Sequence, residues 1–171
     1  MDFNRTFSKY QKSTSINIGR PHKAPNKKHY NYFISIPCYS EFNYILNTLA
    51  SISAQDQILL NDTLVIIVIN NSSNDNKKIK KNNFETYNLL LKKQYNFEFI
   101  AIDCFSNKFA LNSKNSGVGY ARKIGMDFCL EYTNQDSLLC CMDADTLISN
   151  KYFKNISKAF KDELFQACTI N

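Results

Sequence analysis

Four short apolar runs divide the sequence, and segments with helical periodicity separate them. The runs cover residues 32–37, 64–69, 97–105 and 138–142 and are rich in β-branched and aromatic side chains. Amphipathic helices are expected at residues 41–54, 83–95, 120–132 and 150–165. This alternation predicts an α/β fold, in which a mostly parallel sheet has helices on both faces and right-handed crossovers connect the strands.

Polar side chains follow each of the four apolar runs. Because the carboxyl ends of parallel strands lie along one edge of a sheet, these polar turns are expected to meet in a cleft. The turns contain Tyr39 and Glu41, the segment 70–75, the segment 115–122, and Asp143 with Asp145.

The fourth run ends in Asp143-Ala144-Asp145. It fits a strand that is buried on both faces, as in a parallel sheet covered by helices. Alternation along an extended chain sends Asp143 and Asp145 to the same side and turns Ala144 away. Two carboxylates on one side suit Mg²⁺ or Mn²⁺, although such a triplet is also common at a loop start or a helix N-cap.

Several nucleotide-binding classes are excluded by missing motifs. Dinucleotide-binding folds carry a glycine fingerprint directly after the first strand, where this chain has Pro37-Cys38-Tyr39. The sequence contains no phosphate-binding GxxxxGK[ST] loop. Gly117-Val118-Gly119 comes too late for either class and is interpreted as a flexible entry to a helix.

Four motifs in this order resemble family 2 glycosyltransferases of the GT-A fold, over roughly residues 32–160. They are Ile36-Pro37-Cys38-Tyr39-Ser40-Glu41, Val68 to Asp75, Asn115 to Gly125, and Asp143-Ala144-Asp145. The resemblance implies the nucleotide-sugar-binding half of such an enzyme, with the four runs in the sheet order 3-2-1-4. It also implies transfer of a sugar from a nucleoside-diphosphate sugar to an acceptor hydroxyl, with UDP as the favoured nucleotide.

The same resemblance implies roles for single residues. The implied nucleotide-sugar-binding set is Pro37, Tyr39, Glu41, Asn70, Asn71, Asp75, Arg122, Asp143 and Asp145. Tyr39 would lie against the nucleobase, and Arg122 would approach the phosphates. Asp145 and Asp143 would ligate Mn²⁺ or Mg²⁺. The chain departs from the family pattern at Asn70-Asn71, where an Asp pair is usual, and at Lys123, where Asn is usual.

The catalytic base is not identified. The family places its base and acceptor region after the Asp143 strand, and here 26 residues follow Asp145. Asp162 and Glu163 are interpreted as part of a solvated helix face. The alternative to a transferase is therefore a catalytically incomplete nucleotide-binding or interaction module. In a shortened sheet, exposed apolar surface would favour self-association or a partner chain. The acceptor, a glycan, a lipid-linked molecule or a protein, stays open.

The net charge of +6 belongs to residues 1–30, which hold seven basic residues and one acidic residue. We expect a basic, disordered leader there and one domain at residues 31–171. Because the rest of the chain has 14 basic and 14 acidic residues, a nucleic-acid-binding face is not expected. The leader is either a solvated tail or a contact with anionic lipid headgroups.

Location in the cell is predicted from two further features of the sequence. It has no apolar run long enough to span a bilayer and no signal peptide. The six cysteines form no CxxC pair and lie mostly within apolar runs, which is typical of a reducing compartment. These features predict a cytoplasmic protein, or one that is peripheral at the inner face of the membrane.

Overall fold

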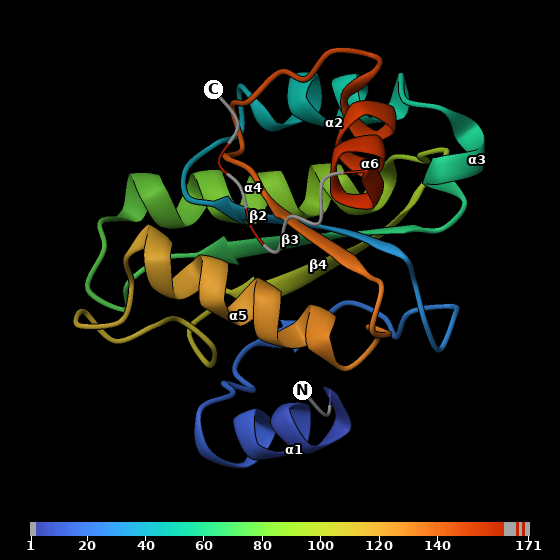
Figure 1. Ribbon diagram of the computed structural model, residues 1–171. Coiled ribbons are helices and arrows are strands. Elements are labelled where there is room, and N and C mark those ends of the chain that lie inside the picture. Colours follow the sequence, from blue (N-terminus) through green and yellow to red (C-terminus); the bar gives the residue numbers. More distant parts are fainter. Residues whose placement is uncertain (1–2, 163–166, 168, 170–171) are drawn as a thin grey trace.

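A computed structural model describes residues 3–162, 167 and 169 of the chain (Figure 1). The helices are α1 (Phe3–Ser13), α2 (Ile45–Ser53), α3 (Gln57–Leu60), α4 (Lys77–Lys92), α5 (Val118–Leu130) and α6 (Tyr152–Asp162). The strands are β1 (Arg20–Pro21), β2 (Tyr32–Cys38), β3 (Thr63–Asn70), β4 (Glu98–Cys104) and β5 (Leu138–Cys141). The α/β class is confirmed, with α1, α3 and β1 as elements that the sequence did not predict.

The described strands form one sheet in the order β1-β4-β3-β2-β5. The four long runs are parallel and stand in the predicted order, while β1 joins the edge antiparallel to β4. The register pairs Cys38 with Ile69 and Ser35 with Cys141. Continued past the strand ends, this register sets Tyr39 beside Asn70 and Pro37 beside Asp143.

Alternation along the strands divides the apolar side chains between two cores. On one face, Ile34, Ile67 and their neighbours pack against α2, α3, α4 and α6. On the other face, Phe33, Ile66 and Val68 pack against α5, and Figure 1 shows α1 lying beyond α5 on this side. β3 is central, and all eight of its residues are buried.

Helix α5 lies close against the sheet at Gly125. A Cβ atom there would lie 2.1 Å from Ser35 Oγ and 3.1 Å from Val68 Cγ2, so only glycine fits this contact. The close approach fixes the helix on which Arg122 stands.

The fourth run was predicted to be buried on both faces, and this prediction is wrong. Leu138, Leu139 and Cys140 are half-buried and Cys141 is exposed, because β5 is the last strand of the described sheet. Among the other cysteines, Cys38, Cys104 and Cys129 are buried as expected, and Cys168 lies outside the described residues.

The leader was expected to be disordered, and for residues 3–30 the structure differs. The Tyr10 hydroxyl and the Ile16 amide both donate to the carboxylate of Asp127 on α5, each at 2.7 Å. Further along, His22 Nδ1 accepts a hydrogen bond from the Ala101 amide at the free edge of β4 (2.9 Å). The segment forms hydrogen bonds with the backbone groups at the edge of the sheet, and these contacts cannot be read from its composition.

Three of the leader's basic residues also pair with carboxylates of the domain. The pairs are Arg20–Asp103 at 3.6 Å, Lys23–Glu98 at 3.5 Å and Lys27–Asp62 at 3.1 Å. Lys9, Lys12 and Lys28 remain exposed, so a contact with anionic lipid stays a prediction. None of the helices in the described part of the chain is long and apolar enough to cross a membrane.

Candidate functional site

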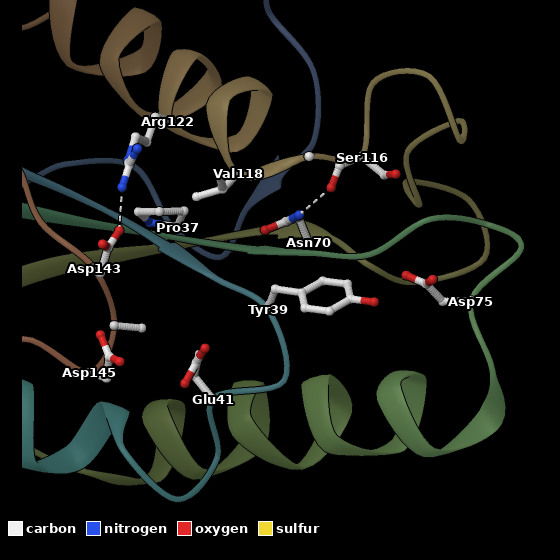
Figure 2. Close-up of a pocket in the computed structure, with 12 residues that line it drawn as sticks. Pro37, Tyr39, Glu41, Asn70, Asp75, Ser116, Val118, Arg122, Asp143 and Asp145 are labelled. Carbon is white, nitrogen blue, oxygen red and sulfur yellow. Dashed lines mark hydrogen bonds and ion pairs between the residues drawn. The ribbon is translucent and has the colours of Figure 1, made fainter.

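A pocket of about 530 Å³ opens at the carboxyl ends of β2, β3 and β5, beside the start of α5 (Figure 2). Its lining consists of Pro37, Tyr39, Glu41, Asn70, Asp75, Ser116, Gly117, Val118, Arg122, Asp143, Ala144 and Asp145. All four polar turns contribute to it. The predicted cleft is therefore present, and it lies at the sheet edge where open α/β folds bind ligands.

Eight of the nine predicted binding residues line this pocket, and Asn71 is the exception. Asn71 is fully buried, where its Nδ2 donates to the Ser72 carbonyl (2.9 Å) and its Oδ1 accepts from Asn83 Nδ2 (3.1 Å). Successive residues of an extended chain point to opposite sides, so the side chain next to Asn70 turns away from the pocket. Asn71 therefore stabilises the turn after β3 through these hydrogen bonds and does not line the pocket.

Asn70 reaches the pocket with its amide oxygen uncommitted. Its Nδ2 donates to the Ser116 carbonyl at 3.1 Å, which fixes the amide orientation because a carbonyl can only accept. The Asn70 side chain is 1% exposed, and its Oδ1 has no hydrogen-bond partner among the described residues. A buried acceptor without a partner is costly, so this position favours a ligand that donates.

Arg122 and Asp143 form an ion pair across the mouth of the pocket, drawn as a dashed line in Figure 2. The two side chains are 38% and 54% exposed. Arg122 Nε is buried and makes no hydrogen bond within the described part of the chain. The guanidinium thus holds Asp143 with one nitrogen and has unused donor capacity.

Asp143 and Asp145 lie at the same pocket, as predicted, whereas Ala144, which was expected to turn away, also lines it. Ala144 is buried, and its carbonyl accepts from Thr48 Oγ1 at 2.6 Å, which anchors the turn to α2. Asp143 and Asp145 are both exposed at the pocket.

Negative charge accumulates on this side of the pocket. Burial raises the pKa of Glu41, and the carboxylates of Asp145 and Asp143 raise it further. The pKa of the Tyr39 hydroxyl is also raised, first by burial and then by the nearby carboxylate of Asp75. Figure 2 shows the Tyr39 ring lying across the pocket with its hydroxyl directed toward Asp75.

Four lining residues were not in the predicted set: Ser116, Gly117, Val118 and Ala144. Ser116 and Gly117 end the loop before α5 and Val118 begins the helix, so the N-terminal end of α5 faces the pocket. A signal existed in the sequence, since Gly117 and Val118 stand inside one of the family-like motifs. They were interpreted as a flexible helix entry because Gly117-Val118-Gly119 is too short and comes too late in the chain for a dinucleotide fingerprint or a phosphate-binding loop.

A divalent cation would find two hard oxygen ligands here, Asp143 and Asp145. Within the described residues, no group of three or more His, Cys, Asp or Glu side chains is arranged to hold a metal. Burial is the largest cause of the raised pKa of Glu41, and the nearby carboxylates of Asp145 and Asp143 raise it further. Two carboxylates are compatible with Mg²⁺ or Mn²⁺, which commonly take few carboxylates and complete their shell with phosphate and water, and the metal stays a prediction.

The catalytic base stays unidentified. Glu163 and the side chain of Asp162 lie outside the described part of the structure. Glu41 lines the pocket beside Asp143 and Asp145, but nothing in the geometry assigns it a proton-transfer role.

A comparison with protein families matches residues 33–169 to the model described as glycosyl transferase family 2. A comparison with curated proteins found no match.

Among solved structures, the chain is similar to S. aureus TarS 1-349 in complex with UDP-GlcNAc. The identity is 14%, the TM-score is 0.55, and the match covers 82% of this chain and 37% of the TarS chain. A second structure of S. aureus TarS 1-349 matches with 15% identity and a TM-score of 0.53, over 82% of this chain and 38% of the other. The likeness shows the fold, and this chain spans less than two fifths of the length of those structures.

Proposed function

The chain belongs to glycosyl transferase family 2, and from this membership we propose that the pocket binds the nucleotide part of a nucleotide sugar. The protein would then take part in moving the sugar to an acceptor hydroxyl. Because the chain covers only 37% of the TarS structure it matches, the acceptor and the transfer step are part of the proposal.

The proposal is supported by two polar atoms of residues that line the pocket. Both atoms are buried, and neither has a hydrogen-bond partner among the described residues. Asn70 Oδ1 is an acceptor and Arg122 Nε is a donor. A ligand that satisfies both must donate a hydrogen bond at one place and accept one at another. A nucleoside diphosphate has this character, since a base can donate N–H and the phosphates accept.

The orientation of Asn70 favours certain bases. Uracil presents an N3–H donor, and guanine an N1–H donor, on the edge that would face Asn70 Oδ1. Cytosine and adenine have an accepting ring nitrogen at the equivalent position and donate only from the exocyclic amino group beside it, so in the same pose their donor would not face Asn70 Oδ1. Tyr39, beside Asn70 in the register, offers an aromatic face for the same base. The pocket therefore favours UDP, with GDP as the second choice.

The other side of the pocket fits the diphosphate. Arg122 carries a planar guanidinium that matches phosphate oxygens, and the N-terminus of α5 adds its positive partial charge. Asp143 and Asp145 would hold Mn²⁺ or Mg²⁺. Such an ion, when bound, supplies positive charge that stabilises the departing diphosphate. On binding, the phosphates would compete with Asp143 for Arg122 and free the Asp143 carboxylate.

UDP is also the probe that a similar structure suggests, because TarS 1-349 was solved in complex with UDP-GlcNAc. The class of the acceptor, a cytoplasmic location and self-association stay predictions.

Calorimetric titration with UDP, GDP, CDP and ADP, each with Mn²⁺ and with EDTA, tests the proposal. We expect metal-dependent binding of UDP, weaker binding of CDP and ADP, and loss of the metal dependence in Asp145→Asn. Asp136→Asn, at an exposed turn outside the pocket, is the matched control. Equal affinity for all four nucleotides would contradict the role of Asn70, and no binding of UDP or GDP would contradict the donor site.

Turnover is a separate question. Hydrolysis of a UDP-sugar, or transfer to an added acceptor, would support a transferase. Metal-dependent binding without either reaction would support the alternative, a nucleotide-binding module that lacks part of the catalytic apparatus.

A further inference from the structure

Two consecutive asparagines, Asn82 and Asn83, stand in the middle of α4, which contributes no side chain to the pocket lining. Asparagine has low helix propensity because its amide competes with the helical backbone for hydrogen bonds. A pair of them in a helix interior therefore needs a reason outside the helix.

Asn83 connects the two turns that carry the nucleobase side of the pocket. It is fully buried, and its Oδ1 accepts from the Ser40 amide at 2.9 Å. Its Nδ2 donates to the Asn70 carbonyl at 2.9 Å and to Asn71 Oδ1 at 3.1 Å. One side chain thus ties the turn after β2 to the turn after β3.

Asn82 binds a second backbone amide of the turn after β2. Its Oδ1 accepts from the Phe42 amide at 3.2 Å. The amides on both sides of Glu41 are therefore held by neighbouring asparagines of α4, while the Glu41 side chain lines the pocket.

The turn that they hold is conformationally unfavourable by itself. Ser40 has φ 61°, the left-handed region, and it is the one non-glycine residue with positive φ in the described part of the chain. Such a conformation persists only where surrounding contacts enforce it, and it is often found at functional sites. The Ser40 amide is the group that Asn83 binds.

We infer that Asn82 and Asn83 are positioning residues for the nucleotide site. They fix the backbone from Ser40 to Phe42 and the backbone of Asn70, so that Tyr39, Glu41 and the Asn70 amide present a preformed surface to the base. The inference rests on the proposed function for its ligand. The inference goes beyond the proposed function because it assigns the shape of the site to two residues that do not line the pocket.

A role in helix packing alone would have a different signature. Leu90, on the same helix, is fully buried in the core and does not line the pocket. Leu90→Ala should lower the free energy of unfolding without changing nucleotide affinity in the folded protein. Asn83→Ala should change both. Asn88→Ala, also on α4 and half-buried, is the control for removing an asparagine from this helix.

The first measurement is calorimetric titration of UDP at a temperature where circular dichroism shows each variant folded. We expect Asn83→Ala to weaken UDP binding at least about tenfold and Asn82→Ala by about threefold, since fewer hydrogen bonds are lost there. Asn88→Ala and Leu90→Ala should stay within about twofold of the unchanged chain. Unchanged UDP affinity in folded Asn83→Ala, or an equal loss in Leu90→Ala, would overturn the inference.

The second measurement needs no ligand and therefore separates this inference from the proposed function. Hydrogen exchange followed by NMR should show slow exchange of the Ser40 and Phe42 amides in the unchanged chain. Asn83→Ala should speed exchange at Ser40, and Asn82→Ala at Phe42, with Asn88→Ala changing neither. If Asn83→Ala does not fold, Asn82→Ala and Asn83→Asp, which keeps the acceptor for Ser40, take its place. Rapid exchange at both amides in the unchanged chain would contradict the inference, whatever UDP does.

Discussion

Arg122 and Lys123 are neighbours on α5, and each forms an ion pair, but the two pairs differ in almost every physical respect. Arg122 meets Asp143 at the pocket mouth, where the side chains are 38% and 54% exposed. Lys123 meets Asp127 on another side of the helix, at 2.8 Å, where Asp127 is 2% exposed.

The surroundings explain what each pair does. Asp127 accepts hydrogen bonds from Lys123, from the Tyr10 hydroxyl and from the Ile16 amide, and Lys123 also lies 5.0 Å from the centre of the Tyr10 ring. This network attaches the N-terminal segment to the domain. The Arg122–Asp143 pair has no such support, so a ligand can replace either partner. The Lys123–Asp127 pair therefore stabilises the fold, whereas either member of the Arg122–Asp143 pair is able to change partner when a ligand binds.

The largest expected effect comes from the buried pair. Asp127→Ala removes the acceptor shared by the Tyr10 hydroxyl, the Ile16 amide and the Lys123 ammonium group, and leaving a buried donor unsatisfied costs about 1–3 kcal/mol. Urea unfolding followed by circular dichroism should show this loss. Asp143→Ala, the matched change in the exposed pair, should shift the free energy of unfolding by less than about 1 kcal/mol. If Asp127→Ala and Asp143→Ala lowered the free energy of unfolding equally, the two ion pairs would not differ in their contribution to stability.

Gly125→Ala should disturb both pairs at once, because they share α5. The new Cβ would lie 2.1 Å from Ser35 Oγ and force the helix away from the sheet, at a cost of about 1–3 kcal/mol. UDP affinity should fall as Arg122 moves with the helix. Gly119→Ala is the control, since nothing lies within 4 Å of its Cβ and alanine favours a helix. A Gly125→Ala variant as stable as the unchanged chain would show that α5 tolerates displacement.

Arg122→Ala should separate binding from stability. We expect UDP affinity to fall about tenfold, because a guanidinium that would bind the phosphates is lost. The free energy of unfolding should change by less than about 1 kcal/mol, as for other exposed pairs. Titration with uridine, which lacks phosphates, provides the internal control. If uridine and UDP lost affinity equally, Arg122 would not act on the phosphates.

The smallest effect is expected at Glu41. Its pKa in the folded protein is raised by burial and by Asp145 and Asp143, so ionisation of Glu41 destabilises the fold. Glu41→Gln should therefore slightly raise the free energy of unfolding at neutral pH. The gain should shrink as the pH falls through the raised pKa and vanish below the ordinary value of 4.5, where the carboxyl is protonated in both states. Urea midpoints at several pH values would show this trend, and a gain that grows toward acid pH would contradict it.

The sequence by itself determined four of the five described strands, the parallel arrangement of these four, and the edge at which polar residues meet. Runs rich in β-branched and aromatic residues favour strands, and parallel strands bring their carboxyl ends together whatever the details of packing. For this reason eight of the nine predicted site residues line one pocket, and the family match covers the same part of the chain.

Features that depend on contacts between residues far apart in the sequence became visible only in the tertiary structure. Tyr10 meets Asp127 across 117 residues of sequence, so a polar leader that composition marks as disordered becomes part of the fold. Asn70 and Asn71 are both buried, and the assembled structure shows that Asn70 lines the pocket whereas Asn71 does not. The low helix propensity of Asn83 did not reveal its partners, because they come from two other turns. Periodicity reports which side of an element is apolar, whereas hydrogen-bond partners depend on how the elements are assembled.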